Sequence, residues 1–274
     1  MTALHITVRL GMIALLGLVP LTSVRAQQPP PSVADAADRP GFADSPIVLR
    51  RGQIQFESGL AWERLGRGQN RARTITWPQM ELHGGVAPRL EVSITWDGLV
   101  SVSTANPPPA LETRRTGLAD VRLGAKFAVA SGSRFDAAVI GYVSLPVGNE
   151  VVSSGYADTL ARFAWMVALD DRFSLAGTAD IGAERQDDGR VRPKPAASAA
   201  LGSTVVAALN GFAGIVVESP PIGSLTDVWS VEGGLTLPVG HLTQIDVWVS
   251  RRLSGGPYDW AIGAGFVRRL REAR

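Results

Sequence analysis

Charged side chains recur on one face of the strand-like segments of this chain, and they have the clearest capacity for chemistry. In residues Arg89–Val100, apolar and polar side chains alternate, so a strand would gather the polar ones on one side. The same alternation places fourteen charged residues on the inner face, and ten of them are our candidates for lining the lumen: Arg89, Glu91, Asp97, Asp120, Arg122, Lys126, Arg162, Asp180, Glu232 and Asp246. Inside a barrel they would either pair across neighbouring strands or line a pore whose charge sets selectivity.

Two neighbouring segments hold the densest group of these charges. We expect this group to form one lumen cluster. One segment contributes Asp120, Arg122 and Lys126, and its neighbour contributes Arg89, Glu91 and Asp97. Charges inside a barrel are costly unless they are paired or hydrated. Neutralising a member of the cluster should therefore change either stability or conductance.

Catalytic, cofactor and metal chemistry find little support in the sequence. His83 and His241 both fall beside predicted turns, where we expect them to be exposed to solvent. Asp187-Asp188-Gly189 matches only a fragment of a calcium loop, so a solvated loop is the better interpretation. We therefore expect no catalytic residue, no cofactor and no metal ligand. An outer-membrane lipid or ester hydrolase that depends on His83 or His241 is the enzyme alternative.

The elements that must position these charges are strands with a period of two. Twelve segments fit this pattern, at about 53–63, 72–83, 89–100, 118–130, 134–145, 159–169, 172–183, 196–208, 212–218, 228–237, 242–251 and 258–270. Pro78 interrupts the second segment and requires a bulge. Ile140 and Tyr142 lie on the nominally polar face of the fifth segment.

The connections between these segments alternate between short and long. Short ones include Asp170-Asp171 and Leu209-Asn210-Gly211, and Asn-Gly favours a tight hairpin. The long ones lie at residues 64–71, 101–117, 146–158, 184–195, 219–227 and 252–257. Bacterial outer-membrane barrels have short periplasmic turns and longer outer loops, so the alternation predicts a transmembrane antiparallel up-and-down barrel of about twelve strands.

The apolar faces of the segments also suit contact with lipid. Outward rows include Leu90/Val92/Ile94/Trp96 and Trp260/Ile262/Phe266. Six of the seven tryptophans fall near segment ends or in such rows, as expected for aromatic girdles, whereas the parity of Trp248 places it on the inner face. A backbone in hydrocarbon must satisfy its own hydrogen bonds, so these strands would have to close into a barrel.

The N-terminal region precedes the strand pattern and divides into three parts. Residues 1–26 read as a cleaved signal peptide, with Arg9 before an apolar run that is too short to span a membrane. Residues 27–37 are a Pro-rich linker without a core, 38–52 form an N-terminal periplasmic segment, and 53–270 form the barrel. The segment from Asp38 to Leu49 contains turn signals and apolar residues, and we hypothesise that it enters the lumen.

Composition limits the partners. The 274 residues carry a formal net charge of +2, and removal of residues 1–26, which hold Arg9 and Arg25 but no acid, leaves 25 basic and 25 acidic residues. A neutral chain is not expected to bind nucleic acid, because phosphate binding needs a basic surface. The absence of Cys excludes disulfides and thiolate chemistry.

Several motifs, in order, resemble one family. The first is DRPGFADSP from Asp38, and WPQMELHGGVAPRLEVSITW, GLADVRLGAKF, SLPVG and the closing DWAIGAGFVRRL follow. Together they are similar to the outer-membrane transporter family named for the meta-pathway of phenol degradation. The resemblance spans Asp38 to Leu270 and implies a bacterial outer-membrane channel for small, hydrophobic or aromatic compounds.

The expected function is passage of a small-molecule permeant through a barrel surrounded by outer-membrane lipid. The alternatives are the hydrolase and a closed structural or binding barrel that does not transport. The identity of the permeant, the openness of the lumen and the oligomeric state are left open by the sequence.

Overall fold

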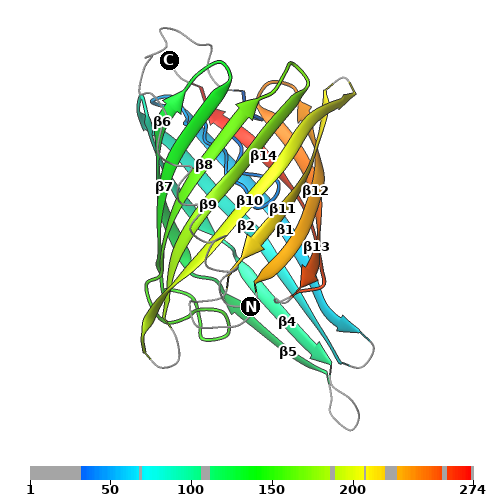
Figure 1. Cartoon of the computed structure of the whole chain (residues 1–274). Coiled ribbons are helices and arrows are strands. Elements are labelled where there is room, and N and C mark those ends of the chain that lie inside the picture. Colours follow the sequence, from blue (N-terminus) through cyan, green and yellow to red (C-terminus); the bar gives the residue numbers. More distant parts are fainter. Residues whose placement is uncertain are drawn as a thin grey trace, which may run out of the picture.

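In the computed structural model of the protein, the strands form one closed antiparallel barrel (Figure 1). The structure describes residues 32–67, 70–105, 112–185, 189–206, 208–219, 227–254 and 258–272. The predicted signal peptide and Asp187-Asp188 lie outside these residues. In the described part of the chain, no helix is long and apolar enough to cross a membrane.

The described residues contain fourteen strand elements. Their bounds are β1 Ile54–Arg67, β2 Asn70–Ala87, β3 Leu90–Trp96, β4 Leu99–Ala105, β5 Thr113–Leu118, β6 Val121–Ser131, β7 Phe135–Leu145, β8 Thr159–Ala168, β9 Phe173–Arg185, β10 Val191–Val206, β11 Leu209–Glu218, β12 Val228–Val239, β13 Thr243–Ser254 and β14 Trp260–Arg271. Each element pairs antiparallel with its neighbours, and β1 pairs with both β14 and β2, which closes the wall.

Two pairs of elements act as single interrupted strands. β3 and β4 both pair with β2 and are separated only at Asp97-Gly98, while β5 and β6 are separated at Ala119-Asp120. Fourteen elements therefore make twelve barrel strands, as the sequence predicted. Gly98 has a φ of +64°, and a Cβ there would collide with the backbone of Pro78. The break between β3 and β4 therefore requires glycine at this position.

Pro78 of β2 lies next to Gly98, at the break between β3 and β4. The register between β1 and β2 shifts between Gly59 and Ala61, opposite Trp77 and Pro78. The bulge expected from a proline within a strand is therefore confirmed. At this break β2 changes its partner from β3 to β4.

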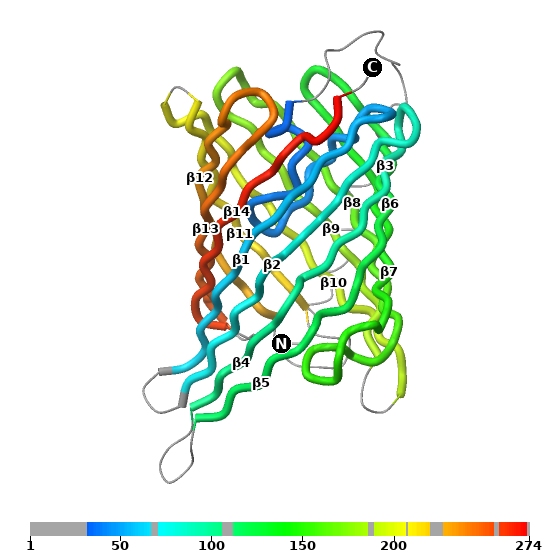
Figure 2. The backbone as a smooth tube through the Cα atoms, turned by 180° about the vertical axis from the view of Figure 1, so that it is seen from behind, coloured from blue at the N-terminus to red at the C-terminus, as the bar shows by residue number. Residues whose placement is uncertain are grey.

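The prediction of a long loop at 101–117 is wrong. Residues 99–105 and 113–118 continue as β4 and β5, and this hairpin projects beyond the barrel wall together with the end of the β1–β2 hairpin (Figures 1 and 2). The predicted loops at 64–71 and 184–195 are also mostly strand. Polar side chains on both faces, as in TRRTGL, hide the period of two that marks a half-buried strand.

The outer face carries the apolar rows that the sequence predicted. Ile94, Phe127, Ile262 and Phe266 are exposed, with 40–51 % of their side-chain surface accessible. Trp248 lies on the inner face and packs against Gly263, as its parity indicated. The wall thus has an apolar exterior and a polar interior, which is the arrangement expected for a barrel in lipid.

Residues 32–52, named the plug here, lie inside the upper half of the barrel, where the chain runs as the dark-blue segment in Figure 2. Val33 and Ala37 pack on Val267 of β14, and Leu49 is fully buried. This placement agrees with the hypothesis that the segment enters the lumen. It also shows that residues 32–37, expected to belong to a linker without a core, are part of the packed interior.

Candidate functional site in the barrel lumen

Two ion pairs bind the start of the plug to opposite sides of the wall. Lys126 of β6 donates from Nζ to both carboxylate oxygens of Asp38, at 2.9 and 3.0 Å. The Arg39 guanidinium reaches Asp246 of β13, with Nη2 3.2 Å from Oδ1. Because Lys126, Asp38 and Asp246 are almost completely buried, these pairs are shielded from the solvent that weakens surface ion pairs.

Arg162 of β8 connects the middle of the plug to the wall. Its Nη1 lies 2.7 Å from Oδ2 of Asp44, and Nε and Nη2 donate to Asp180 of β9 at 2.9 and 2.6 Å. Arg162 and Asp180 are also direct partners in the β8–β9 register, so the sheet positions this pair. Tyr142 of β7 donates its hydroxyl proton to Asp44 at 2.7 Å.

Backbone N–H groups of the plug donate to carboxylates of three further strands. Asp38 donates to Glu57 of β1 at 3.1 Å, Phe42 to Glu232 of β12 at 3.2 Å, and Leu49 to Glu91 of β3 at 2.8 Å. A buried irregular segment needs such partners, because it has no sheet ladder to satisfy its backbone. The carboxylates of the wall therefore accept backbone hydrogen bonds of the plug that a helix or sheet would otherwise accept.

The plug joins the wall through a close backbone contact. Gly52 donates to the carbonyl of Gly85, and Gly85 donates to the carbonyl of Gln53, at 2.8 and 3.1 Å. A Cβ on Gly85 would collide with the carbonyl of Arg50. Glycine at position 85 is therefore what allows the chain to pass this closely before β1 begins.

Asp44 is ionised in this environment. Burial by itself raises the pKa of Asp44, but the charges of Arg162 and Lys126 and the hydroxyl of Tyr142 outweigh it and lower the pKa below the ordinary 3.8. The ion pair with Arg162 is thus intact at neutral pH.

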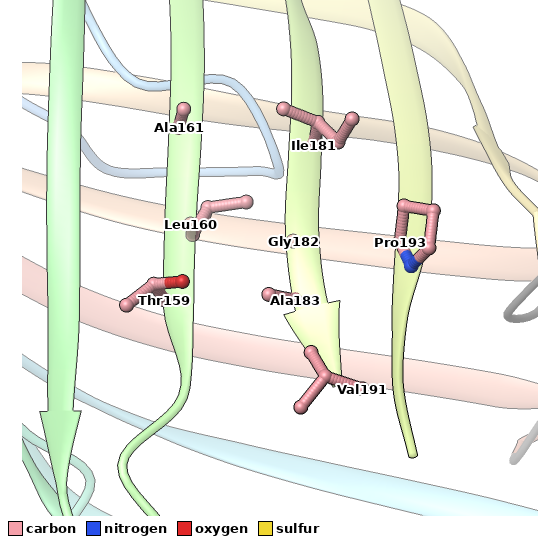
Figure 3. A pocket seen from close by; sticks show the side chains of 8 residues that line it. All are labelled: Thr159, Leu160, Ala161, Ile181, Gly182, Ala183, Val191 and Pro193. Carbon is pink, nitrogen blue, oxygen red and sulfur yellow. The ribbon is translucent and has the colours of Figure 1, made fainter. Parts of the chain in front are cut away.

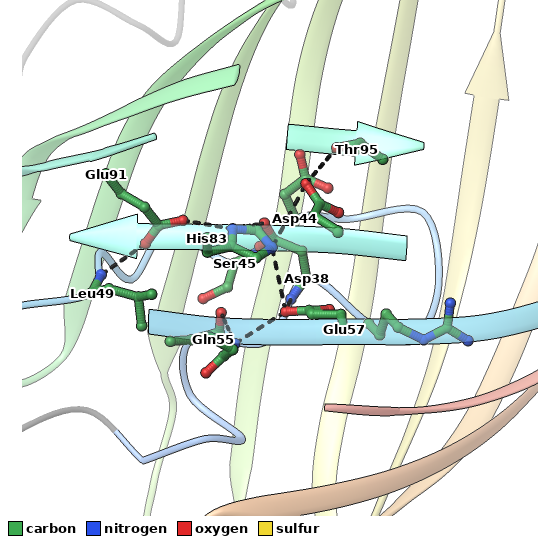
Figure 4. Close-up of polar contacts among 12 residues, drawn as sticks. Asp38, Asp44, Ser45, Leu49, Gln55, Glu57, His83, Glu91 and Thr95 are labelled. Carbon is green, nitrogen blue, oxygen red and sulfur yellow. Dashed lines mark hydrogen bonds and ion pairs between the residues drawn. The ribbon is translucent and has the colours of Figure 1, made fainter. Parts of the chain in front are cut away.

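A second cluster surrounds His83 of β2 (Figure 4). Nδ1 lies 2.8 Å from Oε1 of Glu91, and Nε2 lies 3.6 Å from Oε1 of both Glu57 and Glu81. His83 is 1 % exposed, so the expectation of a solvent-exposed turn histidine is wrong. β2 continues to Ala87, which places position 83 inside the wall; His241, by contrast, is exposed in a turn, as expected.

The ten charged residues predicted for the lumen divide into two groups. Six take part in the network around the plug. Five contact plug atoms directly and the sixth, Asp180, does so through Arg162; the five are Glu91, Lys126, Arg162, Glu232 and Asp246. Glu91 and Lys126 are also cross-strand partners, 3.6 Å apart, and so are Arg162 and Asp180. Pairing across neighbouring strands is thus observed for these two pairs, whereas a role of the inner charges in pore selectivity stays a prediction.

The other four have no described hydrogen bond or ion pair with plug atoms, so the predicted six-residue cluster does not form as one unit. Arg89 is exposed in the β2–β3 turn, and Asp97 is half-buried at the break between β3 and β4. Arg122 lies over the ring of Tyr142, 4.8 Å from its centroid. Asp120 accepts hydrogen bonds from Gly148 N and the Ser153 hydroxyl, so it holds the β7–β8 connection.

Sequence reasoning missed the charged side chains of the plug itself. Asp38, Arg39 and Asp44 precede the alternating pattern, so parity could not assign them to a face. Tyr142 was seen as an exception on the polar face, and its bond to Asp44 explains that position. The signal that could have found these residues was the charge content of DRPGFADSP, a segment otherwise rich in turn residues.

A shallow hollow of about 430 Å³ lies on the wall at β8, β9 and β10 (Figure 3). The exposed side chains of Ile181, Val191 and Pro193 line it together with smaller residues. Its exposed, apolar lining places it on the outer face. It therefore belongs to the apolar outer surface of the wall, and it is separate from the lumen network.

Comparison with known proteins identifies the family. Residues 37–270 match the family described as "Putative MetA-pathway of phenol degradation". The chain belongs to this family. No curated protein matches.

Solved structures share the fold of this family member at low sequence identity. An outer membrane channel from Pseudomonas putida F1 is similar with a TM-score of 0.64 at 13 % identity, over 81 % of this chain and 97 % of that one. The NanC porin follows with a TM-score of 0.51 at 8 % identity, over 79 % and 100 %. The β domain of the Bordetella autotransporter BrkA has a TM-score of 0.50 at 10 % identity, over 80 % and 100 %. The chain has the fold of outer-membrane barrels.

Proposed function

We propose that this protein is an outer-membrane channel for small molecules, whose lumen the plug closes at rest. The observation that carries the proposal is the ring of contacts from β1, β3, β6, β8, β12 and β13 to the plug inside a closed wall. A barrel that served only as a membrane anchor would have no need of a charged segment fastened at so many points. Release or shift of the plug would open the interior.

Small hydrophobic or aromatic molecules are the proposed cargo. This assignment is supported by the description of the family, which concerns the degradation of phenol. Aromatic and aliphatic side chains lie beside the plug contacts, since Tyr142 packs with Ile140 and Ala164, and Phe42 stacks under the Arg162 guanidinium. They would offer apolar surface to a permeant between polar walls.

The proposed setting is the bacterial outer membrane, reached after cleavage of residues 1–26. The exposed apolar rows of the wall support lipid as the surrounding partner, because a soluble protein rarely exposes so continuous an apolar surface. The barrel fold shared with outer-membrane proteins supports the same setting.

Planar-bilayer conductance of the refolded chain from Gln27, compared with a chain lacking residues 32–49, tests the proposal. We expect small or no steps from the complete chain and larger, stable steps after the deletion. A heat-modifiability gel establishes that each barrel is folded. Equal conductance in both proteins would contradict closure by the plug.

The two alternatives give different results in the same preparation. A closed binding barrel would stay silent even without the plug. A hydrolase would cleave phospholipid or ester substrates in detergent, with a loss of activity in His83→Gln. The described partners of His83 are carboxylates, which favours neither a serine nucleophile nor this activity.

A further inference from the structure

The cluster around His83 has more negative charge than the described cations beside it can balance. Four carboxylates have an oxygen within 4.0 Å of the imidazole: Asp38, Glu57, Glu81 and Glu91. Lys126 contacts two of them, Asp38 and Glu91. Glu57 and Glu81 have no described ion pair with lysine or arginine. Arg122 is a second cation that acts on Glu81, but two cations do not match four carboxylates, and buried charges are usually paired or coordinate a metal ion.

Two atoms of the cluster are buried without a hydrogen-bond partner. They are Nε2 of His83 and Oε2 of Glu57, each on a side chain that is 1 % exposed. Such groups are rare in folded proteins and call for an explanation such as an ion. Nε2 faces the space between the carboxylates of Glu57 and Glu81, so the unpartnered nitrogen is aimed into the acidic cluster.

The hydrogen bond at the other ring nitrogen prepares Nε2 for metal binding. A carboxylate only accepts, so the 2.8 Å contact to Glu91 fits a proton on Nδ1. Nε2 then carries the lone pair. Metal-binding histidines usually have this arrangement, in which a second-shell carboxylate fixes the tautomer and makes the ring a better ligand.

We propose that His83, Glu81 and Asp38 of the plug bind a divalent transition-metal ion such as Zn²⁺, with the carboxylate of Glu57 next to the site. One ligand atom from each of Asp38, Glu81 and His83 lies within 4.8 Å of the other two. Ligands about 2.0–2.1 Å from a tetrahedral zinc lie roughly 3.3–3.4 Å apart. The 3.6 Å from Nε2 to each of two carboxylate oxygens is too long for a hydrogen bond and close to that spacing.

Supporting contacts orient the carboxylates of the cluster. Thr95 donates its hydroxyl proton to Glu81 at 2.8 Å, and Gln55 donates to Glu57 at 3.0 Å. Because two ligands belong to β2 and the third to the plug, the ion would fasten the plug to the wall. Metal binding would thus be coupled to closure of the lumen.

Isothermal titration of tag-free, refolded full-length barrel with Zn²⁺, after treatment with a chelator, tests this site. We expect one ion per barrel. His83→Gln and Glu81→Gln should each lower the affinity at least ~100-fold, and the second-shell change Glu91→Gln about 10–100-fold. His241→Gln, which alters the exposed turn histidine, should bind as the unchanged protein does.

The spectrum of Co²⁺ bound to the unchanged protein keeps the test decisive if a variant fails to fold. Visible d–d absorption of tetrahedral intensity, displaced by Zn²⁺, would support one imidazole and oxygen ligands. Absence of stoichiometric binding would overturn the proposal and would leave His83 as an imidazolium shared among carboxylates. Binding that persists in His83→Gln would also overturn it. Neither readout depends on conductance, so the channel proposal stands or falls separately.

Discussion

At the scale of single residues, the lumen is held by charges that the plug and the wall share. Arg162 shows the pattern, since one guanidinium satisfies Asp180 of its neighbouring strand and Asp44 of the plug. Removing one member of a buried pair leaves the other uncompensated, which costs more than the pair contributes. The charges of the plug therefore serve mainly to hold the plug in one position in the lumen, and they add little to the overall stability.

At acid pH, the stability of the docked plug should depend on the protonation of Asp44. The pKa of Asp44 is lowered below 3.8 in the docked plug, so its contribution to docking is complete above 3.8 and is lost as the pH falls through the docked pKa. We expect the rise in bilayer conductance that protonation of Asp44 causes to begin only below about pH 4. Asp44→Asn should weaken docking by about 1.5–3 kcal/mol, because it loses a charge-assisted contact, and should conduct more at pH 7.

The matched comparison for this experiment is the barrel without residues 32–49. It has no plug to release, so its conductance should show no comparable rise on acidification. A rise of equal size in both proteins would place the titrating group in the wall.

At the scale of elements, strand periodicity was enough to predict the barrel. Hydrophobic alternation in segments such as 89–100 and 258–270 set the inner and outer faces, and it placed Glu91 and Asp246 correctly inside. It did not detect most of β4 and β5, which project beyond the wall, and the largely polar sequence TRRTGL of β5 does not show the alternation. It also misjudged His83, because the end of β2 depends on pairing with β3 through Gly85 and Ala87, which sequence alone does not reveal.

The site was less predictable than the barrel. Parity assigns a side chain to the lumen but does not say what it meets there. The partners of Lys126, Arg162, Glu232 and Asp246 lie in an irregular segment with no period, and each contact joins positions at least 88 residues apart. Only the tertiary path of the plug brings them together.

The element that seats the plug is the Gly52–Gly85 contact, and a matched pair of variants tests it. Gly85→Ala should displace residues 50–53, because its Cβ would collide with the Arg50 carbonyl, at a cost of about 1–3 kcal/mol. Gly84→Ala is the control, since its Cβ meets nothing within 4 Å. We expect faster trypsin cleavage after Arg50 or Arg51 in Gly85→Ala alone. Identical cleavage of the two variants would show that this contact does not hold the plug.

At the scale of the whole molecule, both the wall and the plug carry charged side chains, and the wall around the plug has more carboxylates than cations. The wall residues that surround the plug and the His83 cluster include six carboxylates, on Glu57, Glu81, Glu91, Asp180, Glu232 and Asp246, and four arginine or lysine cations, on Arg122, Lys126, Arg162 and Arg269. Removal of the plug removes Arg39, the partner of Asp246, and also Asp38 and Asp44, the partners of Lys126 and Arg162, so the excess of six carboxylates over four cations in the wall is what remains. The open interior should therefore be acidic.

Ion selectivity of the barrel without residues 32–49 measures this imbalance. We expect the reversal potential in a KCl gradient, with chelator present, to show preference for K⁺ over Cl⁻, because charged rings set selectivity in a pore. Glu232→Gln combined with Asp246→Asn equalises the two signs at four each and should abolish the preference. Anion preference in the open barrel would mean that the loop charges at the pore mouth, and not the wall network, determine what passes.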